Sequence, residues 1–263
     1  EVLFYRSEDL HTWTYVNKAW KGPEYGWMWE CPDYFKTDGG EVLMLSAMKL
    51  LPDHVKERNQ SICFPVTFDE ASCALQIPDA YQYLDYGLDL YAPQTTLDKD
   101  GLRTMIAWVR MPRVTEEGWI GMFCSPRVVD VENGHIFFRL HPNIRNAYSR
   151  AVRNVKDVSD DGYMASFDLE DGETADIGGF IISRKGNSIV TDRSSVYPAF
   201  EGAHLISETP ELKGGCHLDV LVDPHLIEVY INDGEYVISN AVYDLGDEIH
   251  CDKEKDILLY TTA

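Results

Sequence analysis

Short runs of apolar residues, alternating or continuous, follow one another along the whole chain and are separated by turn-forming clusters. They occupy 1–6, 13–16, 41–47, 105–109, 180–183, 188–192, 217–222, 227–231 and 236–240. Runs of this length that are rich in β-branched and aromatic residues are typical of strands. Helical periodicity is weak and confined to 144–155. The pattern therefore predicts an all-β protein.

The turns and one polar stretch predict how these strands are organised. Asn232-Asp233-Gly234 lies between two apolar runs and predicts a hairpin whose glycine has a positive φ. The stretch 145–161 contains little apolar material, so we place a boundary there between a domain at 1–144 and a domain at 145–263. Short, evenly spaced strands are found in β-propellers and in β-sandwiches, and the spacing alone does not choose between them.

Charge and length exclude several classes of partner. The 263 residues are 44% hydrophobic, and 44 acidic against 23 basic residues leave a formal charge of −21. This balance argues against a nucleic-acid or anionic-membrane surface, because both require clustered Lys and Arg. No apolar run approaches the length of a membrane span. The chain begins at Glu1 rather than Met, and we expect that it starts inside a longer gene product or after processing.

The six cysteines are scattered, with no pair or Cys/His cluster at metal-ligand spacing. We therefore expect buried free thiols, a cytoplasmic protein, and neither a metal nor a cofactor. The acidic runs at 157–161 and 247–255 lack calcium-loop spacing and are expected to be solvated loops.

Glu30 is the first candidate for chemistry, because it stands among Trp27, Met28 and Trp29. A carboxyl group in apolar surroundings loses hydration and holds its proton more tightly, which is the property of a general acid. The alternative is a surface glutamate beside a core strand. Regular strand alternation would place Asp33 on the opposite face from Glu30 and make it a poor catalytic partner.

The second candidate group lies at 85–94. Regular alternation would place Asp85, Asp89 and Tyr91 on one face. Two carboxylates and a phenol suit hydrogen bonding to sugar hydroxyls, although a solvent-facing strand has the same pattern. Trp108, in a following strand, is either a core residue or a stacking platform for a sugar ring.

These segments resemble glycoside hydrolase family 32, the invertases, fructan hydrolases and sucrose-6-phosphate hydrolases. Glu30-Cys31-Pro32 resembles the family's Glu-Cys-Pro motif. Residues 85–94 are similar to its Asp-x-Gly-x-Asp-Phe-Tyr-Ala-x-Gln segment, with Leu90 in place of Phe. Ala107-Trp108 is similar to its Gly-Trp strand, and 191–194 and 222–235 are similar to strands of its C-terminal domain. The matches follow the order of the family.

The resemblance implies part of a five-bladed β-propeller followed by a C-terminal β-sandwich. It also implies retaining hydrolysis of terminal β-D-fructofuranosides, with Glu30 as acid/base and with Trp108, Tyr91 and Asp89 in contact with the sugar. The family places its nucleophile in an Asn-Asp-Pro motif and a further sugar-binding Asp in Arg-Asp-Pro, and this sequence contains neither. The later blades alone would leave an open face, to which we expect 42–45 and 105–109 to contribute, and through which the chain could form a homo-oligomer.

Two other functions fit the same residues. A chain without the nucleophile motif could be a non-catalytic carbohydrate-binding module or a pseudo-enzyme. A five-bladed propeller hydrolase acting on arabinosides or xylosides is disfavoured by the Glu-Cys-Pro segment. The sequence does not indicate which fructoside is preferred, and Arg103, Arg110 or Arg113 could bind a substrate phosphate.

Overall fold

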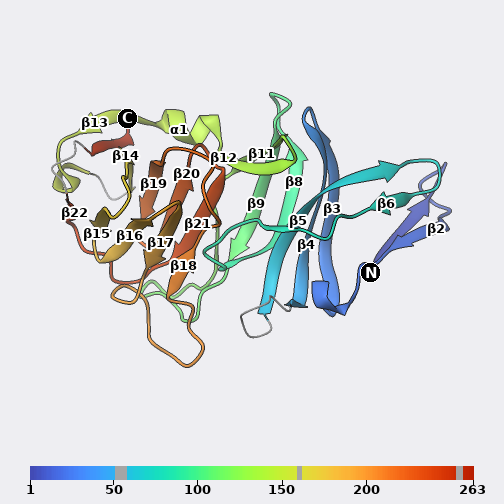
Figure 1. The fold of residues 1–263 in the computed structure, drawn as a ribbon, viewed down its shortest axis with the longest axis horizontal. Coiled ribbons are helices and arrows are strands. Elements are labelled where there is room, and N and C mark those ends of the chain that lie inside the picture. The colour runs from blue at the N-terminus through green and yellow to red at the C-terminus, as the bar shows by residue number, and fades with distance from the viewer. Residues whose placement is uncertain (51–57, 159–161, 253–256) are drawn as a thin grey trace.

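The computed structural model describes residues 1–50, 58–158, 162–252 and 257–263, and most of them lie in antiparallel strands. Figure 1 shows an elongated molecule with a two-layer unit at one end, further sheets in the middle and a two-stranded ribbon at the N-terminal end. Among the described residues, no helix combines the length and the apolarity that crossing a membrane requires.

The N-terminal half consists of a ribbon and two blade-like sheets. The ribbon pairs β1 (Val2–Arg6) with β2 (Thr14–Ala19), and the 3₁₀ turn η1 (Pro23–Tyr25) follows it. The first blade-like sheet contains β3 (Met28–Thr37), β4 (Gly40–Leu50), β5 (Arg58–Asp69), β6 (Ala74–Gln76) and β7 (Gln82–Tyr83). The second contains β8 (Leu90–Leu97), β9 (Arg103–Val109), β10 (Met122–Phe123), β11 (Arg127–Glu132) and β12 (His135–Leu140). The arrangement is all-β and propeller-like, and the strand β8 packs against the first sheet.

The C-terminal unit consists of two antiparallel sheets, preceded by the short helix α1 (Pro142–Ala147). The six-stranded sheet contains β13 (Tyr148–Val152), β23 (Leu258–Thr262), β14 (Tyr163–Asp168), β19 (His217–Asp223), β20 (Leu226–Ile231) and β21 (Tyr236–Ala241), in that order. The five-stranded sheet contains β18 (Ile206–Glu208), β17 (Ser188–Asp192), β16 (Phe180–Lys185), β15 (Thr174–Ile177) and β22 (Ile249–Cys251). A 3₁₀ turn, η2 (Val155–Asp157), lies between β13 and β14.

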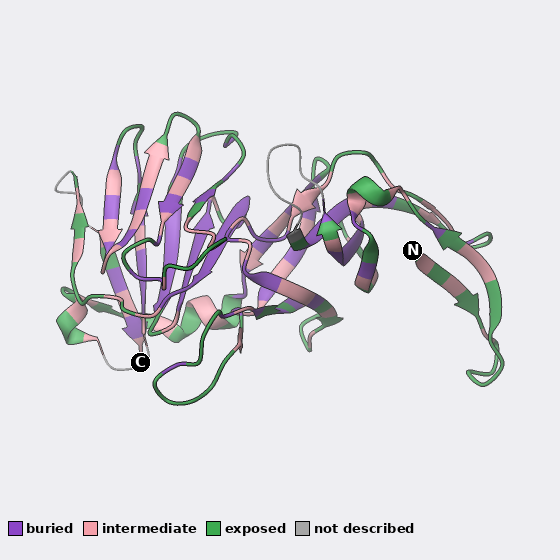
Figure 2. Ribbon diagram, turned by 90° about the horizontal axis from the view of Figure 1, so that it is seen from below, coloured by how far each residue is buried: buried purple, intermediate pink, exposed green. Residues whose placement is uncertain are grey.

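The described residues form three apolar cores, and one of these joins the two halves. The core of the C-terminal unit lies between its two sheets, and a smaller core lies within the first blade-like sheet. The third contains Met44 and Val109 from the blade-like sheets together with Tyr230 and Val237 from the C-terminal unit. Figure 2 shows buried residues continuing through the region where the halves meet, whereas the ribbon is largely exposed. The halves are therefore packed together as one body.

The predicted strands are confirmed, and so is the hairpin at 232–234, where Gly234 has a φ of 86°. All six cysteines are free. The exposure predicted for 42–45 is wrong, because these side chains are at most 1% exposed: successive residues of β4 point into two different cores. Within 105–109 only Ile106 and Trp108 are exposed. The acidic runs 157–161 and 247–255 lie partly outside the described residues.

Buried charges also connect the halves. Arg127 of β11 is fully buried, with Nη1 2.9 Å from Asp85 Oδ2 and Nη2 2.8 Å from Glu228 Oε1. Asp85 lies between the two blade-like sheets in sequence, and Glu228 lies on β20. Burial raises the pKa of Asp85 to about 6, and the neighbouring Arg127 opposes this rise. The arginine therefore provides the counter-charge that two buried carboxyl groups require.

We predict that Arg127→Met lowers the free energy of unfolding by about 3–5 kcal/mol, because it leaves buried carboxylates without a counter-charge. Urea denaturation followed by circular dichroism measures this loss. The matched control is Arg139→Met, whose partners Glu132 and Asp233 lie at the surface, and it should lose less than about 1 kcal/mol. Equal losses in the two variants would contradict the role of the buried charges.

A second prediction concerns the exposed side chains of the ribbon and its turn. Leu3, Tyr5, Leu10, Trp13 and Tyr15 are 50–76% exposed. Apolar patches of this kind favour association, so we expect the chain to form dimers or larger assemblies in sizing chromatography. Leu3→Lys combined with Tyr15→Lys should shift it toward the monomer, whereas Phe200→Lys, a change at an exposed loop of the C-terminal unit, should not. A monomeric parent chain at high concentration would disprove the association.

Candidate active site

Glu30 and Tyr91 meet at the contact between the two blade-like sheets. Glu30 lies on β3, the first strand of its sheet, and Tyr91 lies on β8, the first strand of the next. The phenol of Tyr91 donates a 2.8 Å hydrogen bond to Glu30 Oε2. Both side chains are partly buried. The structure thus brings together two residues that the sequence analysis singled out separately.

The same backbone irregularity occurs in both strands. The register of β3 shifts between Glu30 and Asp33, and the register of β8 shifts between Tyr91 and Gln94. The residue after Glu30, Cys31, has a φ of 48°, and the residue after Tyr91, Ala92, has a φ of 51°. A proline follows each of these residues. Each segment is a β-bulge, which is one of the few places where a strand accepts proline.

The bulge in β3 changes which side chains share a face. Glu30 pairs with Ser46 of β4, and Asp33 pairs with Met44. Because Ser46 and Met44 are two residues apart on a regular strand, their partners project to the same face. The expectation that Asp33 points away from Glu30 is therefore wrong. The bulge contains one extra residue, so the three-residue step from Glu30 to Asp33 returns the side chain to the same face.

Three polar contacts hold the two bulges together. Asp33 Oδ2 accepts hydrogen bonds from the backbone N–H of Thr95 at 2.7 Å and from its hydroxyl at 2.8 Å. The buried hydroxyl of Ser46 accepts a 2.9 Å bond from the N–H of Ala92. The amide of Gln94 donates to the carbonyl of Cys31 at 3.4 Å. These contacts fix β8 on β3 and β4, and so fix Tyr91 beside Glu30.

Burial, and after it the hydrogen bond to Glu30, raises the pKa of Tyr91 well above its ordinary value. The phenol therefore remains protonated at neutral pH and acts only as a donor toward Glu30 Oε2. The guanidinium of Arg110 lies 5.0 Å from the centre of the Tyr91 ring, at a distance suited to a cation–π contact. The positions of both the ring and its hydroxyl are thus defined.

Trp108 is the third member of this site. It pairs directly with Tyr91 across β8 and β9, so the two side chains project to the same face. The residue is 45% exposed, so it is not a core residue, and the alternative of a stacking surface remains. Gly121 has a φ of 79°, which favours glycine, and a Cβ there would lie 2.6 Å from the indole nitrogen of Trp108. Carboxyl, phenol and indole therefore lie on neighbouring positions of adjoining strands.

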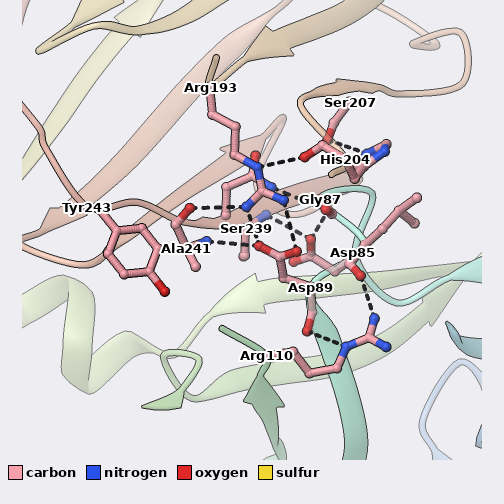
Figure 3. A network of polar contacts seen from close by, with 12 residues as sticks. Asp85, Gly87, Asp89, Arg110, Arg193, His204, Ser207, Ser239, Ala241 and Tyr243 are labelled. Carbon is pink, nitrogen blue, oxygen red and sulfur yellow. Dashed lines mark hydrogen bonds and ion pairs between the residues drawn. The ribbon is translucent and has the colours of Figure 1, made fainter. Parts of the chain in front are cut away.

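Asp89 lies elsewhere. The segment 85–89 is not part of a strand, and the interpretation that Asp85, Asp89 and Tyr91 share one strand face is wrong. Leu88 has a φ of 63°, which breaks the alternation. The carboxylate of Asp89 is buried and binds Arg193 of the C-terminal unit (Figure 3). Sugar contact by Asp89 stays a prediction, and no contact here supports it.

The three arginines considered for phosphate binding have other partners. Arg103 lies over the ring of Phe35, and Arg113 pairs with Asp244 and lies over Tyr243. Arg110 donates hydrogen bonds to the backbone carbonyl oxygens of Asp89, Asn59 and Leu88. Among the described residues, no cluster of three or more His, Cys, Asp or Glu side chains could hold a metal ion.

Sequence reasoning missed Ser46 and Thr95, which hold the bulges, and the packing of Arg110 on Tyr91, since it considered Arg110 for phosphate binding. For the bulges themselves one signal was present in the sequence. Glu30-Cys31-Pro32-Asp33 and Tyr91-Ala92-Pro93-Gln94 share a small residue and a proline at the same two places, and such a repeat indicates equivalent positions in repeated sheets.

Comparison with known protein families agrees with this geometry. The model of the N-terminal domain of glycosyl hydrolases family 32 matches residues 1–142, and the model of the family's C-terminal region matches 154–259. The chain belongs to glycosyl hydrolase family 32. The motif at Glu30 and the segment that contains Tyr91 both lie within the first match.

The matches to individual relatives cover only part of each relative's length. A sucrose-6-phosphate hydrolase of Vibrio alginolyticus is 26% identical in an alignment 278 positions long, which covers 92% of this chain and 54% of the relative. A raffinose invertase of Escherichia coli is 26% identical, over 94% of this chain and 56% of the relative. The chain therefore spans about half the length of the curated relatives that it matches.

Solved structures share the fold. A sucrose-6-phosphate hydrolase from Lactobacillus gasseri superposes with a TM-score of 0.80 at 20% identity, covering 98% of this chain and 60% of that one. A β-fructofuranosidase from Bombyx mori gives 0.78 at 22% identity, covering 98% of this chain and 58% of that one.

The left-handed backbone at Cys31 yields a prediction. Cys31→Val should lower the free energy of unfolding by about 1–2 kcal/mol, because a β-branched residue is strongly disfavoured at positive φ. Cys31→Asn is the matched control, since asparagine tolerates this conformation, and it should be nearly neutral. Urea denaturation of both variants checks the difference. If valine and asparagine have the same effect, the bulge does not constrain this position.

Proposed function

We propose that this chain is the part of a retaining β-fructofuranosidase-type glycosidase that carries the acid/base. In this proposal the blade-like sheets belong to a five-bladed propeller, and the C-terminal unit is the β-sandwich that follows it. The observation that carries the proposal is the grouping of Glu30 on β3, Tyr91 on β8 and Trp108 on β9, all within the range that the family's N-terminal model matches.

Glu30 has the arrangement that an acid/base requires. In retaining hydrolysis one carboxylic acid protonates the leaving oxygen, and its carboxylate then removes a proton from the attacking water. Tyr91 binds Oε2 of Glu30, which orients the carboxyl group and leaves Oε1 available for the leaving oxygen. The exposed indole of Trp108 supplies an apolar surface beside it for a sugar ring.

The reaction also needs a nucleophile. Retaining glycosidases place a second carboxyl group about 5–5.5 Å from the acid/base, where it forms the glycosyl-enzyme intermediate. The sequence has no Asn-Asp-Pro and no Arg-Asp-Pro motif. Asp33 shares the face of Glu30, but its carboxylate is engaged by Thr95. We therefore propose that residues outside these 263 supply the nucleophile.

The relatives support the proposed substrate class. Those named above are a sucrose-6-phosphate hydrolase and an invertase of raffinose, and a Bombyx mori β-fructofuranosidase mutant with the same fold was solved in complex with sucrose. We propose a terminal β-D-fructofuranoside of the sucrose type as substrate. The second candidate function, sugar binding without turnover, is favoured by the missing nucleophile motif alone.

We predict that the purified 263-residue chain releases no fructose from sucrose or from a chromogenic β-fructoside, because no glycosyl-enzyme can form without the nucleophile. Fructose release measured by a coupled assay, with heat-denatured chain as blank, checks this. Release that Glu30→Gln abolishes would show that the chain contains its own nucleophile.

In a protein completed by the nucleophile-bearing blades, Glu30→Gln should lower kcat on sucrose by about 10²–10⁴-fold, the usual effect of losing a general acid. A β-fructoside with a good leaving group needs less protonation, so its hydrolysis should fall much less. Steady-state kinetics on both substrates measure the ratio, with the exposed Glu132→Gln as control. Equal losses on both substrates would indicate a structural role for Glu30.

A further inference from the structure

The segment that precedes Tyr91 is held along the free edge of the C-terminal unit. β21 is the last strand of the six-stranded sheet, so among the described strands none pairs with the alternate N–H groups on its outer side. The N–H of Ser239 donates to Asp85 Oδ1 at 2.7 Å, and the N–H of Ala241 donates to Asp89 Oδ2 at 3.0 Å. The two carboxylates of the segment 85–89 thus accept hydrogen bonds from the edge strand of the C-terminal unit.

Arg193 binds the second of these carboxylates. Its Nη1 donates to Asp89 Oδ2, and its Nη2 donates to Oδ1 at 3.0 Å, which forms a two-pronged pair (Figure 3). The guanidinium is 1% exposed, and its Nε donates to the carbonyl of His204 at 2.8 Å. Only an arginine has the planar fork for this geometry. Asp89 is therefore fixed from the C-terminal unit.

Asp89 in turn fixes Arg110 and Tyr91. Its carbonyl accepts bonds from the backbone N–H of Arg110 at 3.0 Å and from Nε of the same residue at 3.2 Å. The guanidinium also donates to the carbonyl of Leu88 at 2.6 Å and lies over the ring of Tyr91. Tyr91 donates to Glu30. Consecutive contacts therefore run from Arg193 to Glu30.

We propose that Arg193 of the C-terminal unit is a positioning residue for Glu30, acting through Asp89, Arg110 and Tyr91. Its consequence for hydrolysis rests on the function proposed above, but the coupling itself is a property of this chain. The segment has little freedom to relax in another way, because a Cβ at Gly87 would lie 2.0 Å from the carbonyl oxygen of Ser239. Loss of the two hydrogen bonds from Arg193 to Asp89 should therefore change the position of Tyr91 relative to Glu30.

The test uses the 263-residue chain with 3-fluorotyrosine at position 91, observed by ¹⁹F NMR. Glu30→Gln should move the ¹⁹F signal, because it replaces the carboxylate that accepts from the phenol with an amide. In the Arg193→Met background the same Glu30→Gln change should move it by less than half as much. Arg193→Lys keeps the charge without the fork and should give an intermediate value.

Two further variants keep the test decisive. Arg110→Met breaks the contacts on the other side of Asp89 and should weaken the coupling even if Arg193→Met does not fold, which circular dichroism reports. Arg145→Met removes another arginine, which pairs with Asp219, and should leave the coupling unchanged. An undiminished Glu30→Gln shift in folded Arg193→Met or Arg110→Met, or an equal loss in Arg145→Met, would overturn the proposal. If the coupling between Arg193 and the Tyr91 signal is intact, but a protein completed by the nucleophile-bearing blades has no fructosidase activity, only the proposed function is overturned.

Discussion

A set of buried ion pairs at the junction is the constraint on which the molecule depends: Arg193 pairs with Asp89 and Arg127 with Glu228 across it, and Arg127 also pairs with Asp85 of its own half. Asp85 and Asp89 lie four residues apart in one non-strand segment, whereas Arg127 begins β11 and Arg193 directly follows β17. Removing one partner of such a pair typically costs about 3–5 kcal/mol, whereas a whole domain is stable by about 5–15 kcal/mol. Together with the shared apolar core, these pairs make separation of the halves unfavourable.

The site combines local backbone strain with strong local restraint. A left-handed conformation costs a non-glycine residue about 1–2 kcal/mol, and both Cys31 and Ala92 adopt one. The hydrogen bonds from Thr95 to Asp33 and from Ala92 to Ser46 are made at the bulged positions, and they offset part of this cost. The strain also sets the direction of the Glu30 and Tyr91 side chains relative to each other.

The sequence predicts the strands well because their apolar runs are short and clearly bounded, as at 188–192, where the structure has the same limits. It also indicates Glu30, Tyr91 and Trp108, whose motifs are local. It does not predict the face of Asp33 or the burial of Asp89, because both follow from positive φ at residues other than glycine. The complete burial of 42–45 and the role of Arg193 depend on packing between segments far apart in sequence.

The matching bulges in β3 and β8 have a consequence for how chemistry can diversify in this fold. The backbone break is specified by the left-handed residue and the proline, whereas the side chain just before the break is an acid in one sheet and a phenol in the next. The side chain at the position before the break can therefore differ while the backbone conformation around it stays the same. Because both bulges lie in the first strand of their sheet, a substitution at this position in either sheet changes the functional group that is presented toward the neighbouring sheet and leaves its direction unchanged.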